Sequence, residues 1–108
     1  MSTVAEGIAA FAANIDSATL PSNVRATCMR LLEDFIGLAF AARHRDYVAA
    51  TLATATPGPC NAIGQARRVS VYDAALINGT AAHGEDYDDT FEGGPVHSGA
   101  VIVPAVLG

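Results

Sequence analysis

The chain has 108 residues, 51% of them apolar, and it carries 11 acidic residues against six arginines and no lysine. This length and apolar content predict one domain or part of one, with enough apolar side chains for a folded core. Five of the acids lie between Glu85 and Glu92, so the net charge of −5 is a local feature. Because no basic stripe is present to neutralise phosphates, we expect no nucleic-acid partner.

The N-terminus and the cysteines favour a cytoplasmic protein. Residues 1–6 lack the basic and apolar regions of a signal peptide. The apolar run Phe35–Ala42 is far shorter than the roughly 20 residues that cross a bilayer, so we expect no membrane partner. Cys28 and Cys60 are the only cysteines, and we expect them to be free thiols. The chain stops at Gly108 directly after an apolar run, which predicts that the natural fold continues.

Capping signals and apolar spacing predict an all-α fold with at most a trace of strand. Thr3 and Glu6 fit a capping box that opens a first helix running to Asn14. Ser22 is expected to cap a second helix. The second helix has the clearest apolar face, formed by Cys28, Leu31, Leu32, Phe35, Leu38 and Ala39.

The middle of the chain predicts a third, weaker helix and then an irregular segment. The helix is expected over Arg45–Thr54. Pro57–Pro59 is expected to break any regular structure. Cys60–Gly64 is compatible with a short extended segment.

Two further helices are predicted on either side of the acidic stretch. Ser70 and Asp73 fit a variant capping box that opens a helix ending near Gly84, which is expected at the position after the helix. Residues 85–96 are predicted to form a loop. A last apolar helix begins near Ser98, with Pro104 either kinking it or lying close to its start.

The segment His83–Thr90, together with His97, holds the densest group of titratable side chains. Carboxylates packed this closely cannot all ionise at low cost. The end of one helix favours the imidazolium form of His83, and the start of the next favours neutral His97. Such a pair beside carboxylates suits acid–base chemistry near neutral pH. The same residues are also compatible with a solvated loop whose aspartates cap amides.

Three other kinds of site match parts of this segment. Asp86–Thr90 has the D-x-D-x-T spacing of haloacid-dehalogenase-type phosphatases, but the buried apolar strand that this loop needs does not precede it. An EF-hand loop starting at Asp86 would need glycine and glutamate where Phe91 and His97 stand. A transition-metal site formed by His83, His97 and an aspartate is chemically reasonable, but no spacing specifies it.

Four segments, taken in order, resemble the MmgE/PrpD family. Arg30–Ala39 is similar to the family's L-L-D-x-[LIF]-G-[VL]-A helix. Ala74–His83 matches an alanine-rich N-G-x-x-x-H helix, and Asp86–Thr90 matches D-[FY]-D-D-T. His97–Ala105 resembles the family's H-P-G-A-V segment. The resemblance covers nearly the whole chain.

The resemblance implies that residues 1–108 form an incomplete all-α helical domain, with the family's α+β lid domain absent. The family includes 2-methylcitrate dehydratase, cis-aconitate decarboxylase and iminodisuccinate epimerase, usually homodimers that use no metal or organic cofactor. We therefore expect a homodimeric lyase of the 2-methylcitrate dehydratase type, acting on small di- and tricarboxylates without cofactor or metal. The alternatives are a family decarboxylase or epimerase, or a non-catalytic helical fragment that self-associates through apolar faces.

The resemblance also implies roles for the residues of the acidic segment. Asp86 and His97 would be catalytic, and Thr90 would join Asp86 in binding substrate. The resemblance gives a supporting role to His83, Asp88 and Asp89. Separately, we expect the two aspartates to cap amides within the loop. The family's second histidine, its lysines and a tyrosine come from later sequence, so a complete catalytic site is not expected here.

Two departures from the family pattern concern the placement of His97. Ser98 replaces the usual proline after the histidine, and Gly93 and Gly94 lengthen the loop before it. Both changes are expected to affect where His97 lies relative to Asp86.

Overall fold

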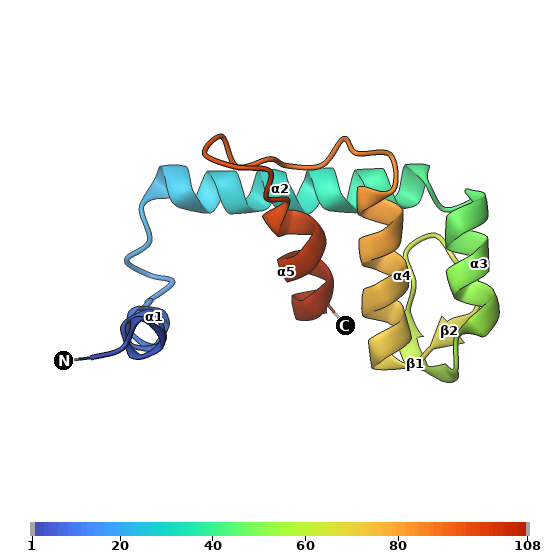
Figure 1. Ribbon diagram of the computed structural model, residues 1–108, viewed down its shortest axis with the longest axis horizontal. Helices are drawn as coiled ribbons and strands as arrows, with labels where there is room; N and C mark the ends of the chain where they lie inside the picture. Colours follow the sequence, from blue (N-terminus) through green and yellow to red (C-terminus); the bar gives the residue numbers. More distant parts are fainter. Residues whose placement is uncertain (1, 108) are drawn as a thin grey trace.

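The computed structural model describes residues 2–107. Met1 and Gly108 lie outside the described residues. The expectation that the natural fold continues after Gly108 therefore also lies outside them. Within residues 2–107, five helices and two short strands follow one another (Figure 1), which confirms the all-α prediction with its trace of strand. They are α1 (Val4–Ala13), α2 (Ser22–Ala41), α3 (Asp46–Thr54), β1 (Pro57–Asn61), β2 (Arg68–Val69), α4 (Val71–His83) and α5 (Ser98–Leu107).

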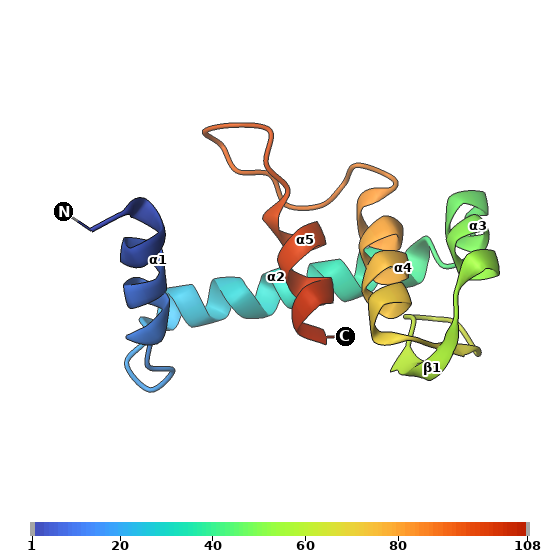
Figure 2. The same cartoon turned by 60° about the horizontal axis from the view of Figure 1, so that its bottom comes forward.

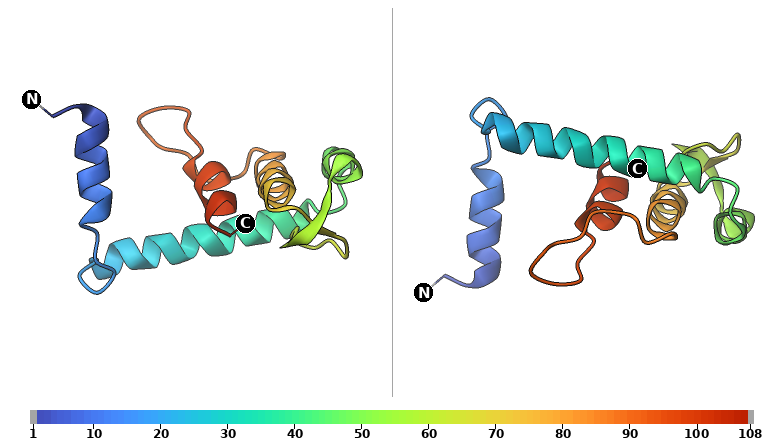
Figure 3. Two further views of the ribbon diagram at one scale, coloured as in Figure 1. Left: turned by 90° about the horizontal axis from the view of Figure 1, so that it is seen from below. Right: turned by 90° about the horizontal axis from the view of Figure 1, so that it is seen from above.

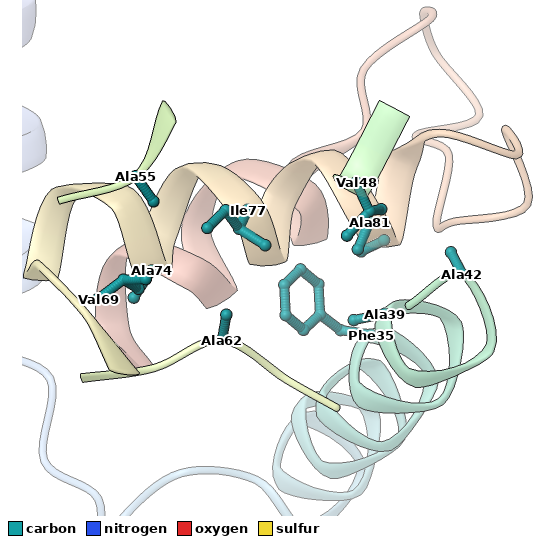
Figure 4. Close-up of a cluster of buried hydrophobic side chains, with 11 residues drawn as sticks. Phe35, Ala39, Ala42, Val48, Ala55, Ala62, Val69, Ala74, Ile77 and Ala81 are labelled. Atoms are coloured by element: carbon teal, nitrogen blue, oxygen red, sulfur yellow. The ribbon is translucent and has the colours of Figure 1, made fainter. Parts of the chain in front are cut away.

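Helix α4 is the centre of the packing. It contacts α2, α3, α5 and β1, while α2 runs across α4 and α5 (Figure 3). Most buried side chains on α4 are small, so neighbouring elements can approach it closely. Figure 4 shows the buried cluster, formed by Phe35, Ala39, Ala42, Val48, Ala55, Ala62, Val69, Ala74, Ile77, Ala81 and Ala82.

The start of α4 shows how its capping signal works. The Asp73 amide donates to Ser70 Oγ at 3.1 Å, as predicted. The Asp73 carboxylate does not reach back to the Ser70 amide, because aspartate is one methylene shorter than glutamate. It accepts instead from the Ser70 hydroxyl at 2.6 Å and from the Thr56 amide at 2.9 Å. These two hydrogen bonds hold the pKa of Asp73 below its ordinary value of 3.8, and they tie α4 to the end of α3.

Two expectations were wrong, one about Pro57–Pro59 as a break in regular structure and one about Ser22 as a helix cap. Pro57 and Pro59 lie within β1, which pairs antiparallel with β2 through an irregular register between Pro57 and Cys60. In a two-stranded sheet each strand has a free edge, where the missing proline N–H costs no ladder bond. At the start of α2, Pro21 is the capping residue and Ser22 is already helical, so the Ser22 side chain makes no cap.

Helices α4 and α5 lie close together at Gly79. A Cβ atom at Gly79 would lie 3.0 Å from the Ala100 carbonyl oxygen. Pro104 lies inside α5 and lacks the N–H that would normally bond that carbonyl four residues earlier. The structure thus settles the two alternatives for Pro104 in favour of a position inside the helix.

Helix α1 stands apart from the packed helices (Figure 2). Its capping box is present, with the Thr3 amide donating to Glu6 Oε2 at 2.7 Å and the Glu6 amide donating to Thr3 Oγ at 3.2 Å. None of its residues is buried, and Ile8 and Phe11 are both more than half exposed. Within residues 2–107, no helix is long and apolar enough to span a membrane.

Asn78 is the buried polar residue of α4 and is 4% exposed. Its Oδ1 accepts from the Ile63 amide at 2.7 Å, and its Nδ2 donates to the Asn61 carbonyl at 3.4 Å. The side chain therefore satisfies the backbone at the end of β1 and in the turn that follows. The N-G pair of the sequence motif has a structural role: Asn78 holds the strand, and Gly79 admits α5.

We expect Asn78→Ala to lower the free energy of unfolding by about 1–3 kcal/mol, because it leaves two backbone groups without partners. Urea unfolding monitored by circular dichroism measures the change. Asn23→Ala, at an exposed position near the start of α2, is the matched control and should be near neutral. Equal effects of the two substitutions would contradict this role of Asn78.

Candidate active site

The C-terminal end of α4 is fixed by a polar cluster that sequence patterns did not reveal. His83 is the last helical residue, as expected. Gly84 follows the helix, as expected, and its φ of −62° is right-handed. Glycine is needed there because a Cβ would lie 2.4 Å from the Tyr47 ring. The next residue, Glu85, accepts from the Tyr47 hydroxyl at 2.9 Å and pairs with Arg45 at 2.8 Å.

The neighbourhood of Tyr47 affects its titration. Partial burial, followed by its hydrogen bond to Glu85, raises the pKa of Tyr47 above its ordinary value of 10.0. Arg45 and Tyr47 are 40 and 38 residues from Glu85 in sequence. The one sequence feature next to Glu85 that relates to these contacts is Gly84, whose lack of a side chain leaves room for the Tyr47 ring.

Asp86 occupies an exposed turn directly after this anchor. Its φ is 58°, a left-handed conformation that aspartate tolerates better than most residues. Its side chain is 78% exposed, and Oδ1 lies 3.7 Å from His97 Nε2. This separation is too long for a hydrogen bond. The Asp86 side chain therefore faces the imidazole and solvent without a hydrogen bond to either ring nitrogen.

Asp88 is buried, with its side chain 3% exposed. His83 Nδ1 lies 3.1 and 3.2 Å from its two carboxylate oxygens. His97 Nδ1 lies 3.4 Å from Oδ1, one of the same oxygens. The expectation that Asp88 caps a loop amide was therefore wrong: its carboxylate contacts two imidazoles.

Asp89 does cap amides, at the start of α5. The Gly99 amide donates to its Oδ1 at 2.9 Å, and the Ser98 hydroxyl donates to its Oδ2 at 2.9 Å. The departure at Ser98 thus adds a hydrogen bond that a proline could not make. An anionic side chain at this position also complements the N-terminal end of the helix dipole.

Thr90 and the glycine pair lie outside the imidazole cluster. Thr90 is exposed, and its Oγ1 lies 3.5 Å from the Asp88 carbonyl oxygen. The extra loop residues close on themselves, since the Phe91 amide donates to the Val96 carbonyl at 2.9 Å. Figure 2 shows this turn projecting away from the helices before the chain returns to α5. The added length is therefore taken up in the turn, which returns the chain to His97 at the start of α5.

The structure brings together both candidate catalytic residues and two of the supporting ones. Atoms able to ligate a metal on His83, Asp86, Asp88 and His97 all lie within 4.8 Å of one another. The two imidazole rings are 4.9 Å apart at an angle of 59°. Such a group can exchange protons with a bound ligand, and its donor set is also compatible with a transition metal.

Comparison with known proteins identifies the family. A family model described as the MmgE/PrpD N-terminal domain matches residues 6–108. The chain belongs to the MmgE/PrpD family. The resemblance of the sequence motifs is thereby confirmed.

Two curated proteins are similar to this chain at moderate sequence identity. Both are named cis-aconitate decarboxylase, one from Aspergillus terreus and one from its strain NIH 2624 / FGSC A1156. Each is 29% identical over 110 residues, which cover 98% of this chain and 22% of the relative. The chain therefore spans about a fifth of the length of these relatives. No solved structure matches the chain significantly.

We expect Asp89→Ala to lower the free energy of unfolding by about 1 kcal/mol, the usual effect of losing a helix cap. Asp86→Asn should change it very little, because Asp86 is exposed and asparagine also accepts positive φ. Thermal unfolding followed by circular dichroism compares the two variants. Unchanged stability in Asp89→Ala would contradict the capping role of Asp89.

Proposed function

We propose that this chain provides one wall of a cofactor-independent lyase site for small di- and tricarboxylates. The observation that carries the proposal is the cluster of His97 with Asp86, Asp88 and His83, in a chain of the MmgE/PrpD family. The name of the two relatives supports a carboxylate substrate. Free thiols at Cys28 and Cys60 agree with a cytoplasmic location, which is part of the same proposal.

In the proposed reaction, a base removes a proton α to a substrate carboxylate and an acid protonates the departing group. His97 is one proton-transfer residue, and Asp86 and Thr90 orient the substrate. With 2-methylcitrate the departing group is the β-hydroxyl, which leaves as water. Decarboxylation of cis-aconitate is the second candidate, because both relatives bear that name. It requires the same electron-rich carbon next to a carboxylate.

The residues described do not supply the positive charge that such substrates need. Arg45 is paired with Glu85, and within residues 2–107 no arginine contacts Asp86, Asp88 or His97. A tricarboxylate would meet net negative charge here. We propose that cationic residues from further sequence, with the remaining helical domain and the lid domain, complete the site.

A chimaeric enzyme tests the proposed site. Residues 6–108 replace the aligned segment of the Aspergillus terreus cis-aconitate decarboxylase, and product formation from cis-aconitate and 2-methylcitrate is measured. We expect turnover by the chimaera and none by the 108-residue chain alone. Asp86→Asn should lower kcat/KM on the order of 100-fold, the low end of what one positioned acid–base or electrostatic group provides.

Glu33→Gln is the matched control in the chimaera, since Glu33 is exposed on α2 and far from the loop in sequence. It should leave turnover unchanged. A chimaera that is folded by circular dichroism yet acts on neither acid would contradict the proposal, as would full activity of Asp86→Asn.

We propose that the reaction needs no metal, although four candidate ligands lie together. Elemental analysis of protein purified without chelator should therefore show far less than one equivalent of zinc, iron or manganese. Stoichiometric metal in the wild type, lost in His97→Ala, would show that the cluster is a metal centre and would overturn this part of the proposal.

A second candidate function is self-association, which the exposed surface favours. The chain exposes 7363 Å², whereas a compact monomer of 11.0 kDa exposes about 5,600 Å². The excess exceeds the ~800 Å² that each partner buries in a standard interface. Unburied apolar residues lie on α1 and along an apolar groove between α2 and α5.

We expect the chain to form a homodimer through these apolar surfaces. Sedimentation equilibrium of the wild type should give about twice the monomer mass at micromolar concentration. Phe11→Asp, which places a charge on the exposed face of α1, should shift the equilibrium toward monomer, while Glu33→Gln should not. A monomeric wild type at all accessible concentrations would contradict self-association.

A further inference from the structure

Asp88 differs from the other acids of the loop because it is enclosed and is shared by two imidazoles. Its side chain is 3% exposed, against 78% for Asp86. Nδ1 of His83 and Nδ1 of His97 both approach its Oδ1, at 3.1 and 3.4 Å. An ionised carboxylate accepts hydrogen bonds and cannot donate them. Attraction at both contacts therefore requires a hydrogen on each Nδ1.

The position of His97 makes this requirement strong. Its Nδ1 is buried and lies 3.4 Å from Asp88 Oδ1, but this contact is not a hydrogen bond, so Nδ1 has no hydrogen-bond partner among the described residues. A buried polar atom without a partner destabilises the folded protein. A lone pair on Nδ1 would in addition face a carboxylate oxygen. Catalytic hydrogen bonds are often long without ligand and shorten when a ligand is bound. We therefore expect the distance between His97 Nδ1 and Asp88 Oδ1 to shorten on ligand binding.

Once Nδ1 carries the hydrogen, the other ring nitrogen of neutral His97 carries the lone pair. That atom, Nε2, is the one that faces exposed Asp86 at 3.7 Å. The ring thus has one nitrogen directed to the buried carboxylate and the other directed to the exposed side of the cluster.

We propose that Asp88 is a positioning residue that holds His97 in the Nδ1–H tautomer and leaves Nε2 free to accept a proton. This deepens the proposed function and rests on it, because Nε2 is then the atom that would take the substrate's α proton. His83 holds the carboxylate from the other side. Its Nδ1 lies within 3.2 Å of both oxygens, and its position at the end of α4 is fixed by the helix.

The tautomer can be read directly in the 108-residue chain by long-range proton–nitrogen NMR correlation of the imidazoles. The spectrum is recorded about two pH units above the ordinary histidine pKa of ~6.5, so that ordinary imidazoles are neutral. We expect His83 and His97 to show a protonated Nδ1 and an unprotonated Nε2. His44 is exposed and has no acidic partner among the described residues, so it serves as the internal reference.

Asp88→Ala then removes the shared acceptor. We expect the nitrogen shifts of His83 and His97 to move toward those of His44. Asp89→Ala is the matched control, because it removes an acid from the same loop and a cap from α5 but contacts neither imidazole. It should leave both tautomers unchanged.

A wild-type spectrum with a protonated Nε2 on His97 would overturn the proposal, whether or not Asp88→Ala folds. So would an Asp88→Ala variant with an unchanged His97 signature, or an Asp89→Ala variant with the same change. The readout does not depend on turnover. Failure of the lyase proposal in the chimaera is therefore distinguishable from failure of this one.

Discussion

The close approach of α4 and α5 is the constraint on which the candidate site depends. The two helices meet where Gly79 faces the Ala100 carbonyl, with no room for a larger residue without displacement. The acidic loop connects the end of one helix to the start of the other. Its ends, His83 and Ser98, are therefore fixed by helix packing, and the imidazoles of His83 and His97 lie on either side of Asp88 as a result.

The rest of the fold fixes α4 at several points along its length. Ser70 and Asp73 cap its start and bond to Thr56, Asn78 holds the segment after β1, and Glu85 is bound by Tyr47 beyond its end. The side chains of a site are held in position most precisely when they lie on rigid helices or strands. The outer turn at residues 91–96, by contrast, is closed by its own backbone bonds.

The sequence predicted the helices because their signals are local. Capping at Thr3 and Ser70 and the apolar spacing of α2 involve residues three or four positions apart. The paired strands could not be predicted in this way, since β1 is rich in proline and β2 has two residues. The anchor of Glu85 on Tyr47 depends on a contact across 38 residues, which no single-sequence pattern reports. The family motif singled out this loop, but only the structure could distinguish buried Asp88 from exposed Asp86.

A nuclear Overhauser measurement between the ring protons of His83 and His97 in the 108-residue chain tests the central claim most directly. Packing of α4 against α5 brings the two imidazoles together, with ring centres 4.9 Å apart. We therefore predict a clear cross-peak between the two rings in the absence of any ligand. If the chain is folded and the cross-peak is missing, the helices do not position the loop as described, and the shared role of Asp88 is contradicted.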